Sequence, residues 1–193
     1  MKLINKLKKI NKLYYTIADL QKITGYKTDS LYVILNRFIN QKELMRLASG
    51  VYILMERYGE IEKIANLIYF PSYLSFESAL SKQGVISQMP YLLTFTTVNK
   101  TKKLMLGDYR VEYRKIKEEL FWGYKMTDGL MIATPEKALF DMYYIASFGK
   151  ADFDFQAVDK SRIDMNRVKE MFDKFGVKIS LPSEGLSLRP HKG

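Results

Sequence analysis

The amino-acid sequence predicts an α+β fold, with a small helical unit and a β-hairpin first and a larger mixed α/β domain after it. Apolar residues recur at helical spacing through the first forty residues, and two strand-like runs around a glycine follow them. The remaining chain alternates strand-like and helical segments. The chain has 193 residues, 47% of them hydrophobic and 13% aromatic, and can bury a core without a metal or disulfide.

Residues 2–13 form a predicted amphipathic helix, because leucines and isoleucines repeat every three or four residues and lysines fill the other face. A basic amphipathic helix can lie on a membrane surface. The segments that follow favour instead a helix that packs within a domain.

Two further helices are predicted next. Thr16 is the expected N-cap of a helix over 17–24, and Gly25 ends that helix in the left-handed conformation. Thr28 is the expected N-cap of a helix over 28–40, whose apolar residues repeat at i, i+3, i+4 and i+7. The other residues on this second helix are polar or mixed: Asp29, Ser30, Tyr32, Val33, Asn36 and Arg37.

Two strand-like runs within residues 43–54 flank Ala48-Ser49-Gly50, where glycine suits the positive φ of a hairpin turn. Three helices followed by a hairpin predict a winged helix-turn-helix over residues 1–55. The helix over 28–40 is then the recognition helix, and the hairpin is the wing.

The charge distribution favours a nucleic-acid partner for this N-terminal unit. The chain carries a net charge of +10, and residues 1–55 hold ten lysines and arginines against three acids. Asn36 suits pairing with adenine and Arg37 with guanine or phosphate, while Lys27, Lys42 and Arg46 suit phosphates. A winged helix can also be a protein-interaction module, and that alternative stays open.

The rest of the chain predicts a connector over 56–70 and an α+β domain over 71–193. Its single tryptophan, Trp122, is expected to be a packing residue. Chain after Pro182 is expected to be loose. The predicted elements are helices over 72–82, 136–147 and 165–175 and strands over 91–98, 103–106, 109–116 and 129–133.

Composition argues against an enzyme. The chain has no cysteine, and its one histidine is His191, so thiolate, zinc and Ser-His-Asp chemistry lack their residues. Asp152 and Asp154 have the spacing of a metal-binding carboxylate pair, but the Gly-Ser turn of nucleotidyltransferases is missing. We expect no cofactor and no metal. The sequence also lacks an apolar run of 18 residues and a secretory signal, which predicts a cytoplasmic protein with no membrane partner.

Two segments together resemble the AbiEi family of bacterial antitoxins and transcriptional regulators. The first is Leu44-Met-Arg-Leu-Ala-Ser-Gly-Val-Tyr-Ile-Leu54, which is similar to the wing of that family. The second is Ile132-Ala-Thr-Pro-Glu-Lys-Ala-Leu-Phe-Asp141, about 80 residues later. The resemblance covers most of residues 1–150.

This resemblance implies a repressor that binds inverted repeats in double-stranded DNA upstream of its own operon, where a dimer can form. It also implies an antitoxin that counteracts a neighbouring nucleotidyltransferase-type toxin without a stable complex. The N-terminal domain would bind DNA, and the C-terminal domain would supply antitoxicity. Matching motif positions implicate Lys27, Thr28, Ser30, Arg37 and Arg46 in DNA binding. Glu136 and Lys137 are interpreted as a helix cap and a surface pair. The full candidate DNA-binding set is Lys27, Thr28, Ser30, Tyr32, Asn36, Arg37, Lys42, Arg46 and Ser49.

Two other functions compete with this hypothesis. The chain could be a stand-alone winged-helix regulator whose α+β domain senses a small molecule or a partner protein. It could also be a nucleotidyltransferase that uses Asp152 and Asp154.

Overall fold

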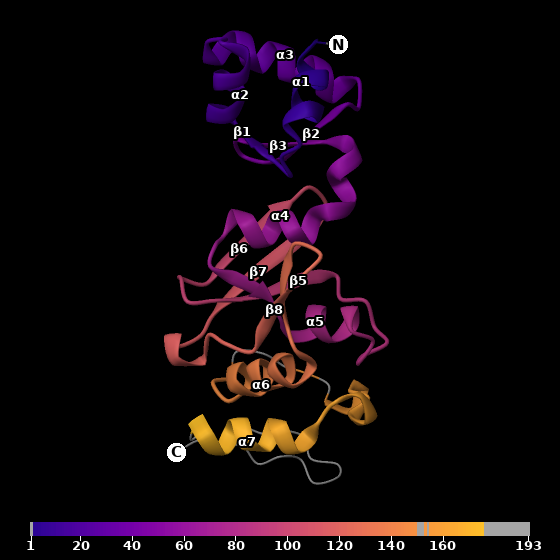
Figure 1. Ribbon diagram of the computed structural model, residues 1–193, viewed down its shortest axis with the longest axis vertical. Coiled ribbons are helices and arrows are strands. Elements are labelled where there is room, and N and C mark those ends of the chain that lie inside the picture. Colours follow the sequence, from indigo (N-terminus) through magenta and orange to yellow (C-terminus); the bar gives the residue numbers. More distant parts are fainter. Residues whose placement is uncertain (1, 150–152, 154, 176–193) are drawn as a thin grey trace.

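The computed structural model describes residues 2–149, 153 and 155–175, and these residues form an α+β fold (Figure 1). The described strands make a three-stranded sheet in the order β1-β3-β2 and a six-stranded sheet in the order β6-β7-β5-β4-β9-β8. Asp152, Asp154 and the tail after Pro182 lie outside the described residues.

The small sheet and three helices form the N-terminal unit. Its helices pack around buried Leu20, Leu31, Leu35 and Phe38, with Tyr52 contributed by the sheet. The elements are α1 (Lys2–Ile10), β1 (Tyr15–Thr16), α2 (Ile17–Thr24), α3 (Thr28–Asn40), β2 (Leu44–Ala48) and β3 (Val51–Leu54).

The first helix is shorter than the sequence predicts, since α1 ends at Ile10 rather than at residue 13. Asn11 takes a φ of 57°, and its N–H donates to the Leu7 carbonyl at 2.9 Å. The buried Tyr15 hydroxyl donates to the same carbonyl at 2.6 Å. This tertiary contact turns the chain into β1, a two-residue strand that the apolar pattern did not predict.

The larger sheet and its helices form the rest of the molecule. Short 3₁₀ helices at Met55–Glu60 (η1), Glu118–Leu120, Phe155–Ala157 and Lys160–Arg162 connect the main elements. Those elements are α4 (Ile61–Ile68), β4 (Ser72–Leu74), α5 (Phe76–Lys82), β5 (Leu92–Thr97), β6 (Lys102–Leu106), β7 (Tyr109–Lys115), β8 (Tyr124–Thr127), β9 (Leu130–Ala133), α6 (Pro135–Ala146) and α7 (Met165–Phe175).

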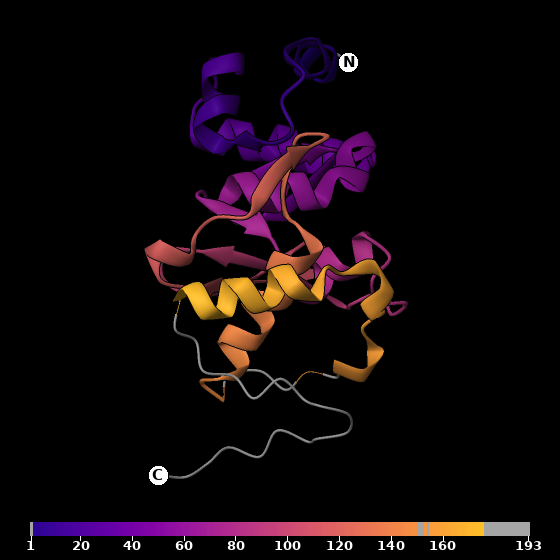
Figure 2. The same ribbon diagram turned by 60° about the horizontal axis from the view of Figure 1, so that its bottom comes forward.

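The large sheet is mixed and is covered on both faces. β4 pairs antiparallel with β5 and parallel with β9, while β5 pairs parallel with β7. Figure 1 shows α4 on one face and α6 on the other, and α6 in turn contacts α5 and α7. Figure 2 shows α7 lying across α6. Trp122 packs between these two helices, with its ring 6.0 Å from that of Phe140 and 5.2 Å from that of Phe175.

One predicted element in this half is wrong and one is missing. The sequence predicts a helix over 72–82, whereas Ser72–Leu74 is the strand β4 and the helix α5 begins at Phe76. Hydrogen bonding on both edges by β5 and β9 outweighs the helical spacing of this short segment. The strand β8 was not predicted. The predicted strands at β5, β6, β7 and β9 and the bounds of α7 are confirmed.

The two halves of the molecule share a packed junction. Leu47 and Ile53 of the small sheet belong to the same buried cluster as Ile61 and Ile64 of α4. The Gly107 N–H, at the turn between β6 and β7, donates to the Leu47 carbonyl at 2.9 Å. The β6–β7 turn therefore covers the outer edge of β2 and fixes the N-terminal unit on the large sheet.

Buried phenols predict a loss of stability at alkaline pH. Burial raises the pKa of Tyr15, Tyr73 and Tyr113 above the ordinary value of 10.0. A raised folded-state pKa contributes stability that is complete below the unfolded pKa and is lost as pH rises above it. We expect the free energy of unfolding to fall by about 1.4 kcal/mol per pH unit per tyrosine above pH ~10.

Urea unfolding at pH 8, 10 and 11.5 measures this loss. The variant Tyr113→Phe serves as the control, because it removes one of the titrating phenols and should show a shallower decline with pH. An equal urea midpoint at all three pH values would contradict the expectation.

Candidate nucleic-acid interface

The orientation of α3 is set by the way α2 begins and ends. Thr16 caps α2 in a capping box, since its hydroxyl accepts from the Asp19 N–H and the Asp19 carboxylate accepts from the Thr16 N–H. Gly25 ends α2 at a φ of 73°, a conformation that glycine adopts at little cost. The sharp turn after Gly25 lets α3 cross α2 while both bury leucines in one core.

The N-cap of α3 differs from the prediction. Lys27, not Thr28, is the N-cap, and its side chain makes no capping hydrogen bond. The Thr28 hydroxyl instead accepts from the Gln21 side-chain amide at 3.0 Å. Thr28 therefore ties the start of α3 to α2 and holds the first turn of α3 in place.

One face of α3 is buried and the opposite face is open to solvent. Leu31, Leu35 and Phe38 are buried. Tyr32 is 40% exposed and Val33 71% exposed, and Figure 1 places α3 at the end of the molecule farthest from α7. The two faces are therefore separated cleanly, and the outward side of α3 is uncovered.

All nine candidate residues lie on the surface. Within the described part of the chain, the side chains of Asn36, Lys42 and Ser49 make no hydrogen bond or ion pair, and the Arg37 guanidinium makes neither but lies 5.1 Å from the centroid of the Phe38 ring. These polar groups are free to meet an external partner. The exposed candidates are Lys27, Thr28, Ser30, Tyr32, Asn36, Arg37, Lys42, Arg46 and Ser49.

The hairpin brings Arg46 to the side of α3. Arg46 lies opposite Tyr52 in the β2–β3 register. Burial raises the pKa of the Tyr52 phenol, and the nearby Arg46 charge opposes that shift, while Tyr32 of α3 adds to it. The strand β2 contacts α3, so the exposed Arg46 is carried on a strand that packs beside this helix.

The turn of the hairpin has a different surrounding. The Gly50 carbonyl accepts from the Ile17 N–H at 3.2 Å, which places the turn beside the start of α2. Ser49 is exposed next to this contact. The hairpin is short, and its outer edge is covered by the β6–β7 turn.

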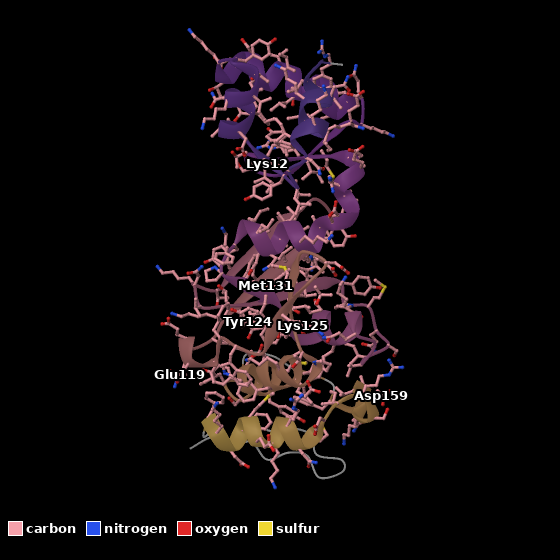
Figure 3. All side chains as sticks on the ribbon, viewed as in Figure 1. Lys12, Glu119, Tyr124, Lys125, Met131 and Asp159 are labelled. Atoms are coloured by element: carbon pink, nitrogen blue, oxygen red, sulfur yellow. The ribbon has the colours of Figure 1, made fainter. Side chains whose placement is uncertain are left out.

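Some of the basic excess in the N-terminal unit is already neutralised. Lys12 pairs with Asp19 at 2.7 Å, and Lys8 pairs with Glu56 at the same distance. The Lys12 ammonium lowers the pKa of the Asp19 carboxyl, together with the hydrogen bond from the Thr16 N–H. Lys12 lies at the junction between the two halves (Figure 3), away from the outward side of α3. Among the residues that the structure describes, the unpaired basic residues in α3 and directly before, after and beside it are Lys27, Arg37, Lys42 and Arg46.

The second family-like segment forms a buried charge network rather than a surface site. Lys137 and Asp141 are fully buried and form an ion pair. The Asp141 carboxylate also accepts from the hydroxyls of Tyr73 at 2.9 Å, Ser75 at 2.7 Å and Thr96 at 3.1 Å. The expectation that Lys137 belongs to a surface pair is wrong.

The surroundings of the Lys137 ammonium are aromatic. Its Nζ lies 4.9 Å from the Trp122 ring centroid and 4.8 Å from that of Phe140. Burial lowers the pKa of Lys137, while the Asp141 charge opposes that shift. A Cβ at Gly123 would lie 2.9 Å from the Lys137 Cγ, so only glycine leaves room for this side chain. Both charged side chains of the network are fully buried.

A hollow of about 420 Å³ lies between α4, α5 and the β8–β9 hairpin. Lys125 lines it from β8 (Figure 3). Its other lining residues combine charged groups with two buried aliphatic side chains: Glu62, Lys63, Lys82, Gln83, Thr127, Asp128, Leu130 and Ile132. Its size falls in the range of small-molecule sites.

Comparison with known proteins identifies no relative: no family model matches the chain, and no curated protein matches it. Within the described ranges, the helices are too short or too polar to cross a bilayer. In the same residues, no group of three histidine or carboxylate side chains is arranged to hold a metal ion.

The buried network predicts a large cost for removing its cation. Lys137→Met leaves the Asp141 carboxylate buried without a counter-ion, and we expect the free energy of unfolding to fall by about 3–5 kcal/mol. Urea unfolding measures the change. Lys103→Met is the matched control: its ammonium pairs with Glu112 at 3.4 Å but its side chain is 75% exposed, so the cost should be below ~1 kcal/mol. An equal fall in the free energy of unfolding in the two variants would contradict the stabilising role of the buried ion pair.

Proposed function

We propose that residues 1–55 are a winged helix-turn-helix that binds double-stranded DNA, with α3 in the major groove and the β2–β3 hairpin on the adjacent backbone. The observation that carries this proposal is the uncovered face of α3, on which Asn36 and Arg37 are available. Asparagine pairs with adenine and arginine with guanine through two hydrogen bonds each, which gives sequence selectivity.

Three basic residues around α3 support the proposal. Lys27 precedes the helix, Lys42 follows it, and Arg46 flanks it from β2. Cations on either side of a recognition helix bind phosphates and fix the helix in its groove. The remaining candidates, Thr28, Ser30, Tyr32 and Ser49, are hydroxyl-bearing residues suited to phosphate or base-edge contacts.

We further propose that the protein represses its own operon in the cytoplasm and counteracts a nucleotidyltransferase-type toxin encoded beside it. This part rests on the AbiEi-like segments at 44–54 and 132–141. The second segment covers the end of β9 and the first half of α6, where Lys137 and Asp141 lie in the core of the C-terminal domain. The proposal assigns no catalysis to the chain and no cofactor.

A second candidate function is a stand-alone regulator whose C-terminal domain senses a small molecule. The hollow lined by Lys63, Lys82, Lys125 and Asp128 favours it. A ligand screen by thermal melting separates the two candidates, because a sensor should be stabilised by its ligand and an antitoxin without a ligand should not.

The DNA-binding proposal predicts a specific effect of Arg37→Ala. If Arg37 reads a base, the variant should bind the upstream region of its own gene about 1–3 kcal/mol more weakly than the parent protein does. Fluorescence anisotropy with that region and with a scrambled duplex measures the difference. With about six phosphate contacts per protomer, log K should fall with log salt at a slope near ~−5.

The matched control is Arg167→Ala on α7, which removes the same charge at the opposite end of the molecule. It should leave both affinities unchanged. Equal binding of the parent and Arg37→Ala to both duplexes would overturn the assignment of α3 as the recognition helix.

The same variant tests the antitoxin part of the proposal. Arg37→Ala should release expression of a reporter behind the protein's own promoter, yet still protect cells that express the neighbouring gene. This separation is expected because the C-terminal domain is unaltered. A neighbouring gene that is harmless by itself, or cells that the protein fails to protect, would contradict the antitoxin assignment.

A further inference from the structure

The centre of the exposed α3 face is apolar. Val33 is 71% exposed, although the other aliphatic residues of the helix are wholly or partly buried. Its neighbours one turn away on the helix surface are polar: Asp29 at i−4, Asn36 at i+3 and Arg37 at i+4. A single exposed valine on a protein surface is ordinary. Val33, however, is flanked by hydrogen-bonding side chains on an otherwise polar face, and this arrangement favours a partner that presents one apolar group among polar ones.

Major-groove chemistry supplies that match. The base edges in this groove carry hydrogen-bond donors and acceptors, and the thymine C5-methyl is their one apolar group. Valine is short and stiff about χ1, so its two methyl groups have a fixed position relative to the helix. The Arg37 and Lys27 charges favour a polyanion at this face over an apolar protein surface.

We propose that Val33 reads a thymine methyl in the DNA site of this protein. The inference rests on the proposed DNA-binding function and adds the base that the site must contain. When α3 lies in the major groove, the side chain at the middle of its outward face reaches the base edges. Val33 then excludes water from the thymine methyl.

The spacing of Val33 and Asn36 places this thymine relative to a second base. One turn of an α-helix advances 5.4 Å, whereas successive base pairs are 3.4 Å apart. Side chains three residues apart therefore meet base pairs one or two steps apart. With Asn36 on adenine, each half-site should hold an A·T pair and, one or two steps away, the thymine contacted by Val33.

Replacing thymine by deoxyuridine tests the contact, because this change removes only the C5-methyl. The full-length protein first selects its site from a pool of random duplexes. Each thymine of the selected site is then replaced singly by deoxyuridine. At one thymine per half-site, the parent protein should lose roughly three- to ten-fold in affinity, the cost of exposing one or two methyl groups.

Val33→Ala completes a double-mutant cycle with the same duplexes. This variant should bind the thymine site roughly three- to ten-fold more weakly and should not distinguish thymine from deoxyuridine. Alanine is the better helix former, so the variant should fold. Met126→Ala on β8 removes an exposed apolar side chain far from α3 and should retain full discrimination.

The outcomes separate the inference from the function it rests on. If no sequence is enriched from the random pool, the DNA-binding proposal and this inference both fail. If a sequence is enriched but no deoxyuridine weakens binding, or Val33→Ala discriminates as the parent does, the inference alone is wrong. A change in self-association of Val33→Ala, with unaltered discrimination, would assign Val33 to a protein contact and also overturn the inference.

Discussion

The buried carboxylate of Asp141 is the constraint on which the larger half of the molecule depends. It joins α6 to β4 through Tyr73, to the start of α5 through Ser75 and to β5 through Thr96. Lys137, one turn earlier on α6, neutralises its charge. A carboxylate in an apolar core is costly unless every oxygen is paired, so the sheet, α5 and α6 are held in one arrangement. The C-terminal half is therefore a single packed body that supports the N-terminal unit.

The C-terminal half in turn fixes the position of the N-terminal unit. The β6–β7 turn pairs with the edge of β2 through Gly107, and Leu47 and Ile53 continue the core of the large sheet into the small one. The small sheet is thus held against the body while α3 projects outward. A unit that a packed junction already holds in place has no linker flexibility to lose when it binds a partner. This reduces the entropic cost of binding.

Sequence reasoning predicted the elements with local signals and missed those that depend on distant partners. The helix α2 has a cap, a periodic core face and a terminal glycine, and all three act within a few residues. The strand β4 has only three residues and a helical neighbour, and it is defined by hydrogen bonds to β5 and β9. Lys137 looked like a surface residue because its helix start is polar. The carboxylate lies one turn further along the same helix, but Trp122 and Tyr73, whose rings also surround the ammonium, come from other segments that no local pattern brings together.

The exposed face of α3 also shows why net charge is an incomplete guide to function. Several lysines of the basic first quarter are paired with acids or lie away from α3, and the face itself combines Arg37 with Asp29. Charge of this kind attracts DNA from a distance and holds its backbone, but it does not distinguish one sequence from another. Discrimination must come from groups whose match depends on the base. If α3 binds DNA as proposed, those groups are the amide of Asn36, the guanidinium of Arg37 and the methyl groups of Val33. In that proposal the apolar residue belongs with the selective groups, although a search for basic residues alone would pass over it.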